Sequence, residues 1–152
     1  MEKFFILLSW LLIGLTSCAN PTPTAVPAPK LSIENAWGRM SPTMAQAGVF
    51  YLTIRNTGSV ADKLTAAKSS ACGTAELHES YMLANGAMGM RMLMGGIDVP
   101  ANGTAELKAG GLHIMCVDKK VEFNAGVKIP LTLVFEKSGE MNLVVEIRDQ
   151  GM

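Results

Sequence analysis

Charged and aromatic side chains are both scarce in this chain. Aspartate, glutamate, lysine and arginine make up 17% of the 152 residues, and thirteen basic residues balance thirteen acidic ones. Without a surplus of positive charge, the chain has no electrostatic basis for binding nucleic acid or an anionic membrane surface. Aromatic residues amount to only 6%, which is too few for a surface on which bases could stack. The sequence therefore predicts no nucleic-acid partner.

Histidine and cysteine are also few, with two and three residues. No H-x-x-x-H or C-x-x-C spacing occurs, so the common zinc-binding patterns are absent. Neither histidine has a serine-triad pattern nearby, and a hydrolytic metal site would normally include carboxylates or further histidines. We therefore expect a binding protein without catalytic turnover and not an enzyme.

The N-terminus has the features of an export signal. Lys3 precedes an apolar run over residues 4–15, which is shorter than the ~20 residues of a membrane-spanning helix. Residues 1–17 are therefore predicted to be a secretory signal peptide. The run Leu15-Thr16-Ser17-Cys18 resembles the bacterial lipobox, in which cleavage precedes a cysteine that becomes lipid-modified. An ordinary signal peptide with an incidental cysteine is the alternative.

Cys18 is thus the predicted lipidation site and the first residue of a predicted tether over residues 18–30. Four prolines stand among the twelve residues 19–30, and proline-rich segments favour an extended, semi-rigid conformation. The predicted location is the cell envelope, with the protein anchored on the extracytoplasmic side, in the periplasm or on the outer face of a membrane. Residues 31–152 are long enough for one folded domain.

The pattern of this domain is that of an all-β protein. Short alternating runs rich in β-branched residues are separated by Gly, Asn and Pro, and no long helical period competes with them. We expect a Greek-key sandwich or barrel of about nine antiparallel strands. The predicted strands are Leu31–Trp37, Gly48–Asn56, Leu64–Ser70, Thr74–Met82, Met88–Met94, Thr104–Lys108, His113–Val117, Leu131–Lys137 and Met141–Arg148.

Methionine is abundant, with eleven residues, five of them from Met82 to Met94. Met88, Met90, Met92 and Met94 alternate, so on one strand they would project from the same face. A core face built of methionine is the structural alternative, although flexible methionine specifies packing poorly.

Both histidines fall near this cluster in the sequence. His113 and Met115 share one strand face, and the apolar positions Ala75 and Leu77 place His78 on the opposite face of its own strand. Thioethers are soft ligands that select Cu(I), whereas carboxylates and carbonyls suit magnesium and calcium. A set of histidine and methionine donors therefore predicts binding of Cu(I).

The residues that carry this chemistry also resemble a known family, the periplasmic copper chaperones called PCu(A)C. The family's signature of a histidine, a later methionine and a final His-x-Met matches His78, Met90 and His113-Ile114-Met115. The segments AELHES, MGMR, IDVPANGTAELKAGGLHIM and PLTLVFEKSGEMNLVVEI are similar to the family's pattern. The resemblance implies a cupredoxin-like fold, Cu(I) bound by His78, Met90, His113 and Met115, and delivery of copper towards the CuA centre of cytochrome oxidase. The implied acceptor is an oxidase subunit or its assembly factor.

Both intervals between the signature residues are one residue longer than in the family. The extra residues fit the turns around Asn85-Gly86 and Gly95-Gly96, where loops tolerate insertions. The M-G-M-R segment selects Met90, but Met88 and Met92 share its face and remain alternatives.

Cys72 and Cys116 form an even pair in an oxidising compartment, which favours a disulfide. The alternative makes Cys116 a thiolate ligand in a blue-copper electron-transfer protein. Strand alternation opposes that alternative, because it places Cys116 on the face opposite His113 and Met115. It also gives Cys72 the parity of His78, so the disulfide would require a bulge or a strand start at Gly73. A copper-free envelope interaction domain is the third possibility.

Overall fold

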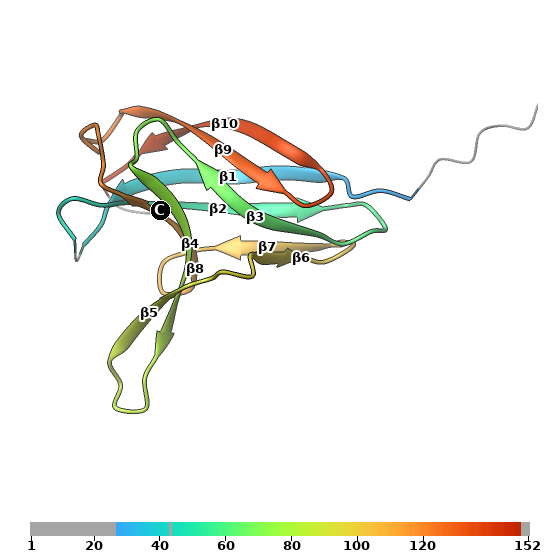
Figure 1. Cartoon of the computed structure of the whole chain (residues 1–152), viewed down its shortest axis with the longest axis horizontal. Coiled ribbons are helices and arrows are strands. Elements are labelled where there is room, and N and C mark those ends of the chain that lie inside the picture. Colours follow the sequence, from blue (N-terminus) through green and yellow to red (C-terminus); the bar gives the residue numbers. More distant parts are fainter. Residues whose placement is uncertain (1–26, 43, 150–152) are drawn as a thin grey trace, which may run out of the picture.

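A computed structural model describes residues 27–42 and 44–149, and these form an all-β domain without helices (Figure 1). Ten strands follow one another along the chain, and the predicted fold class is confirmed. The strands are β1 (Leu31–Met40), β2 (Gly48–Asn56), β3 (Asp62–Lys68), β4 (Thr74–Met82), β5 (Met88–Met92), β6 (Ile97–Val99), β7 (Gly103–Leu107), β8 (Leu112–Val117), β9 (Lys128–Phe135) and β10 (Gly139–Ile147). The predicted signal peptide, Cys18 and most of the tether lie outside the described residues.

Each of the nine predicted strands is present, with ends that differ by a few residues. The tenth strand, β6, was not predicted because three residues are too few to establish an alternating pattern. Met94 was expected to belong to β5, but the strand ends at Met92 and Met94 lies in the turn that follows.

All ten strands belong to one sheet with the order β5-β4-β8-β7-β2-β1-β10-β9-β3-β6, and β8 also pairs with β2. The sheet curls on itself, so that its inner face encloses the core (Figure 1). Most neighbours are antiparallel as predicted, but β1 pairs with β10 and β7 pairs with β8 in parallel. Alternation within a strand does not indicate whether its neighbour runs parallel or antiparallel to it, so the pattern could not predict these two parallel pairings.

The main core is built from alternate residues of the strands. Phe50, Leu52 and Ile54 of β2 are fully buried there, as their alternation predicts. Val145 and Ile147 of β10 join them. Leu143 lies on the same side of β10 and is half-buried against this core.

A second, smaller cluster lies on the outer face of the sheet. It consists of Ala47, Val49, Tyr51 and Met115, with Trp37 and Val117 packed against it. Strand β2 is therefore covered on both faces along most of its length, as is typical of strands in the middle of a layered fold. This outer cluster borders the β4–β5 hairpin, which extends away from the rest of the domain (Figure 1). Among the described residues, no helix has the length and hydropathy needed to cross a membrane.

Gly48 of β2 gives a test of this packing. A Cβ atom at position 48 would overlap the ring of Phe123, which is buried in the core against Phe50 with ring centroids 5.5 Å apart. We expect Gly48→Ala to lower the free energy of unfolding by about 1–3 kcal/mol, the usual cost of overpacking a core. Urea denaturation measures this difference.

Gly95→Ala is the matched control, because a Cβ atom there meets nothing within 4 Å. This variant should stay within about 0.5 kcal/mol of the wild type. Equal unfolding free energies for the two variants would contradict the packing described around Phe123.

Candidate metal centre

The pairing of β4 with β8 brings the two histidines together. In this antiparallel pair His78 lies directly opposite His113, and the preceding pair, Leu77 and Ile114, points into the core. Because successive side chains alternate between faces, both imidazoles project from the outer face of the sheet. Their ring centroids are 5.8 Å apart, with an angle of 47° between the ring planes.

Met115 follows two residues after His113 and projects from the same face. It is 2% exposed and packs in the outer cluster with Val49 and Tyr51. His113 is 5% exposed, and its ring centroid is 6.4 Å from that of Tyr51. These two candidate ligands are thus held in place by the body of the domain.

The methionines of β5 approach the same face from the edge of the sheet. Across the β4–β5 pair, Met92 lies opposite His78, Met90 opposite Ser80 and Met88 opposite Met82. Met88, Met90 and Met92 are 43–55% exposed, so they are not part of a packed core. The expectation that alternating methionines share one face holds for these three residues.

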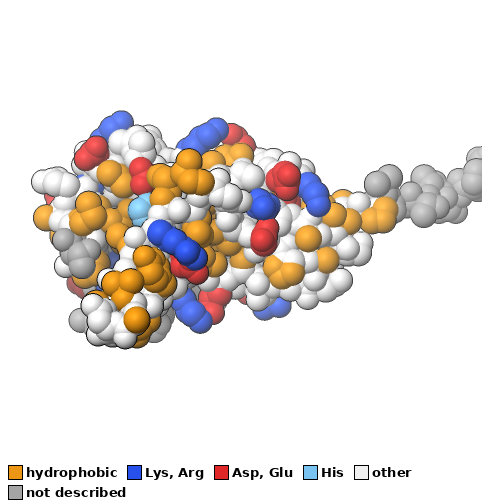
Figure 2. Space-filling view, turned by 60° about the horizontal axis from the view of Figure 1, so that its bottom comes forward, with side chains coloured by type: hydrophobic (Ala, Val, Ile, Leu, Met, Phe, Trp, Pro, Cys, Tyr) orange, Lys and Arg blue, Asp and Glu red, His pale blue; other side chains and the backbone are white. Residues whose placement is uncertain are grey.

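A cavity of about 370 Å³ collects three of the four predicted ligands, Met90, His113 and Met115. Met88 also lines it, together with Arg39 and Tyr51. His78 lies beside the cavity through its ring contact with His113. In Figure 2 hydrophobic side chains gather on the part of the molecule that comes forward at the lower left, and a histidine is visible at the surface above them.

Met92 has a different relation to the site from Met90. Met92 is the cross-strand neighbour of His78, whereas Met90 lines the cavity with His113 and Met115. Met88 shares the cavity with Met90. The cavity therefore separates Met88 and Met90 from Met92, which lies closest to His78 by strand register, and it does not choose between Met88 and Met90.

The hydrogen bond of His113 determines which of its nitrogens is available. Nδ1 lies 3.0 Å from the carbonyl oxygen of Gly111, and a carbonyl can only accept, so Nδ1 carries the proton and Nε2 retains its lone pair. Burial lowers the pKa of His113 below 6.5 and the neighbouring His78 adds to this effect, while the bond to Gly111 opposes it. His113 is therefore a neutral imidazole at neutral pH, the form that binds metal.

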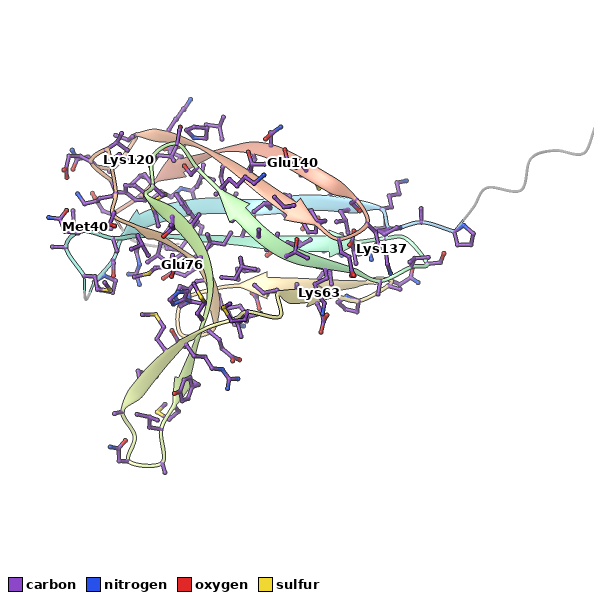
Figure 3. All side chains as sticks on the ribbon, in the orientation of Figure 1. Met40, Lys63, Glu76, Lys120, Lys137 and Glu140 are labelled. Atoms are coloured by element: carbon purple, nitrogen blue, oxygen red, sulfur yellow. A yellow bond between two sulfur atoms is a disulfide. The ribbon has the colours of Figure 1, made fainter. Side chains whose placement is uncertain are left out.

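His78 has a carboxylate partner that the sequence analysis did not single out. Its Nε2 lies 2.9 Å from Oε2 of Glu76, and its Nδ1 is buried without a hydrogen-bond partner among the described residues. Glu76 and His78 are two residues apart on β4, so they share a face. That E-x-H spacing was the available signal, and Figure 3 labels Glu76 where β4 leaves the sandwich for the hairpin.

The predicted disulfide between Cys72 and Cys116 is present, with the two Cα atoms 5.3 Å apart. Cys116 is buried in the main core, on the opposite side of β8 from His113 and Met115. Cys72 lies in the turn before β4 begins at Thr74, so no bulge is needed for the bond. With its sulfur bonded to Cys72, Cys116 is not a thiolate ligand, and the blue-copper alternative is wrong.

Within residues 27–42 and 44–149, no three His, Cys, Asp or Glu side chains gather as a metal-binding group. The donors that converge on the cavity are three thioethers, from Met88, Met90 and Met115, and the imidazole of His113; the imidazole of His78 lies beside them. Soft thioethers with neutral imidazoles suit Cu(I) and are poor ligands for magnesium or calcium.

Comparison with known sequences identifies a family and a relative of this chain. The family model described as "Putative lipoprotein LpqE-like" matches residues 31–147. The protein named "Putative lipoprotein Lxx21020" from Leifsonia xyli subsp. xyli is 32% identical over 144 residues, which cover 91% of this chain and 85% of that protein.

Several solved structures share the fold. The apo PCuAC domain from PmoF1 is 29% identical with a TM-score of 0.65, covering 83% of this chain and 98% of that one. The copper-bound PCuAC domain from PmoF2 is 22% identical, also with a TM-score of 0.65, and covers 83% and 97% of the two chains. Cu(I)-bound DR1885 from Deinococcus radiodurans is 21% identical with a TM-score of 0.60, and the cover is 84% and 83%. The predicted cupredoxin-like fold and the resemblance to PCu(A)C domains are confirmed.

The state of His113 can be measured in the metal-free protein. Because burial disfavours its charged form, we expect the ring to titrate with a midpoint below 6.5, the ordinary pKa of histidine. The imidazole signals in an NMR pH titration give this midpoint, and His113→Gln assigns them. A midpoint above 6.5 would contradict a buried, neutral His113.

Proposed function

Since this chain belongs to the LpqE-like lipoprotein family and has the cupredoxin-like fold of PCuAC domains, we propose that it is a copper chaperone of the cell envelope. It binds Cu(I) through His78, Met90, His113 and Met115, and passes the ion on without catalytic turnover. The observation that carries this proposal is the cavity lined by Met90, His113 and Met115, with the ring of His78 beside it.

The chemistry of the four donors favours the monovalent ion. Two thioethers and two neutral imidazoles bring no negative charge, so the bound ion retains its single positive charge. Cu(II) prefers harder nitrogen and oxygen donors in a tetragonal arrangement, which this set does not supply. The disulfide removes the thiols of Cys72 and Cys116 as competing ligands.

The unequal exposure of the donors suits transfer of the ion. His113 and Met115 are buried against the domain, whereas Met90 lies on the exposed edge strand β5. An incoming ligand from an acceptor protein can therefore replace the thioether of Met90 first, while His113 and Met115 still hold the ion. The proposed acceptor is a cytochrome oxidase subunit that carries the CuA centre, or its assembly factor.

The proposed anchor is Cys18, with residues 1–17 removed as a signal peptide. The family and the Leifsonia relative are both described as lipoproteins. A thioether-linked lipid together with an amide-linked chain gives stable membrane attachment, whereas one acyl chain gives only marginal binding. Residues 18–30 then act as the proline-rich tether, and the copper-binding domain of residues 31–152 lies on the extracytoplasmic side.

The copper site predicts a stoichiometry and a ranking of substitutions. The protein should bind one Cu(I), and His113→Ala and Met115→Leu should weaken binding most because these residues form the buried half of the site. The loss should exceed the roughly 10–100-fold that removal of a ligand's hydrogen-bonding partner costs. Met90→Leu should have a smaller effect, because Met88 and Met92 can replace its thioether. Anaerobic titration against a colorimetric Cu(I) chelator measures these affinities.

Met94→Leu is the matched control for the methionine variants. Met94 is 88% exposed and does not line the cavity, so its replacement should leave the affinity unchanged. X-ray absorption of the Cu(I)-loaded protein should detect both nitrogen and sulfur around the ion. A shell of nitrogen alone, or unchanged affinity in His78→Ala and Met115→Leu, would show that these residues pack together without forming the copper site. Absence of Cu(I) binding by the wild type would favour a copper-free envelope domain.

The anchor is tested separately from the metal site. Cys18→Ala should move the protein from the membrane fraction to the soluble fraction, or stall its processing, because the lipid can no longer be attached. Fractionation without detergent, followed by immunoblotting, measures this shift. Persistent membrane association of the processed variant would argue against Cys18 as the anchor.

A further inference from the structure

Glu76 is held between two hydrogen-bonding partners on β4. Its Oε2 lies 2.9 Å from Nε2 of His78, and its Oε1 accepts a hydrogen bond of 3.1 Å from the hydroxyl of Thr74. The side chains of Glu76 and His78 are 25% and 14% exposed, so solvent competes only weakly for this contact. All three residues alternate along one strand and lie on the face that carries the candidate metal ligands.

This contact determines which nitrogen of His78 has a free lone pair. An ionised carboxylate only accepts hydrogen bonds, so Nε2 must carry the proton of the neutral ring. Nδ1 is then the acceptor, and it is buried without a hydrogen-bond partner among the described residues. Buried polar atoms are nearly always satisfied in folded proteins, and an unsatisfied one beside two candidate ligands indicates a missing binding partner.

We propose, on the basis of the proposed function, that Glu76 is a positioning residue that holds His78 in the Nε2–H tautomer and directs Nδ1 to the copper ion. His113 has the opposite arrangement, since its Nδ1 bonds to the carbonyl of Gly111 and its Nε2 is left for metal. The two imidazoles therefore bind one ion through different nitrogens. Each ring is oriented by an oxygen on its other nitrogen, the usual arrangement around metal-bound histidine.

Glu76 itself is not the ligand. Both of its carboxylate oxygens are engaged, one by Thr74 and one by His78. A carboxylate is also a hard donor, which suits magnesium, calcium or manganese better than Cu(I). Glu76 contributes to copper binding indirectly, because it orients the His78 ring and increases the basicity of its free nitrogen.

The tautomer is measured in the full chain by long-range ¹H–¹⁵N NMR of the histidine rings. Without metal, in mildly alkaline buffer, His78 should show a protonated Nε2 and an unprotonated Nδ1. Addition of Cu(I) should shift the Nδ1 resonance of His78 and the Nε2 resonance of His113. In Glu76→Ala the two tautomers of His78 should become mixed.

Affinity is measured on the same variants by anaerobic competition with a Cu(I) chelator. Glu76→Ala should weaken binding by about tenfold to a hundredfold, the range found when such partners of metal-bound histidines are removed. Glu76→Gln should lose less Cu(I) affinity, because its amide oxygen can still accept a hydrogen bond from Nε2–H of His78. Thr74→Val removes the support of Glu76 but leaves its contact with His78, so it should cost less than Glu76→Ala.

Glu79→Gln is the matched control. Glu79 also neighbours His78 on β4, but it lies on the opposite face and binds Arg91, with Nη2 and Nε at 2.6 and 3.0 Å from Oε2. The Glu79→Gln substitution removes one negative charge close to His78 without changing a contact of the imidazole ring. The Cu(I) affinity of this variant should therefore equal that of the wild type. If Glu79→Gln and Glu76→Ala lost the same amount of Cu(I) affinity, the loss would be explained by net charge, and the positioning role of Glu76 would be overturned.

The outcomes separate this inference from the proposed function. Wild-type protein that binds Cu(I) with Nε2 of His78 shifted, or Glu76→Ala with unchanged affinity and tautomer, overturns the inference and leaves the copper carrier intact. Wild-type protein that binds no Cu(I) overturns the proposed function and the copper-directing role of Glu76 with it. The spectrum of the metal-free protein still decides in that case whether Glu76 selects the tautomer.

Discussion

The antiparallel register of β4 and β8 is the constraint on which the site depends. It sets Leu77 against Ile114 in the core and His78 against His113 outside. A slip of one residue would turn every side chain of the strand to the other face, so burial of the apolar pair also fixes the imidazole pair. The Cys72–Cys116 disulfide acts on the core side of these strands and joins the turn before β4 to β8. All four proposed ligands fall between the two cysteines. By loop length alone, closing a segment with a sequence separation of 44 stabilises the fold by about 4 kcal/mol in the chain-entropy model.

The candidate site divides into a rigid half and an accessible half. His113 and Met115 are packed beside Val49 and Tyr51, so little side-chain entropy remains for a ligand to remove. The methionines of β5 belong to an edge strand in an exposed hairpin and keep most of theirs. An ion bound by both halves would have ligands of fixed geometry on one side and exchangeable thioethers on the other. This arrangement fits a protein that carries and releases the ion better than a permanent structural site.

Much of the fold was predictable because strand alternation is a local property. The inward positions Phe50, Leu52 and Ile54 follow from period-two patterning, and so does the outward position of His78. Strand β6 escaped prediction because three residues do not make a pattern, and Met94 was misplaced because the end of β5 depends on where β4 stops pairing with it. The parallel pairing of β1 with β10 joins the two ends of the domain, and neither strand's own sequence encodes that contact.

What the sequence by itself determined was the set of candidate donors and the face from which each projects, since side-chain chemistry and alternation need no knowledge of neighbours. Only the tertiary structure decided which donors meet. It set His78 opposite His113, placed Met90 in the cavity and Met92 beside His78, and brought Glu76 to His78 Nε2. It also placed Cys72 in a turn, where strand parity no longer applies, so that its sulfur reaches Cys116. The physical reason is that strand partners and register are chosen by burial and hydrogen bonding over the whole sheet, between residues far apart in the chain.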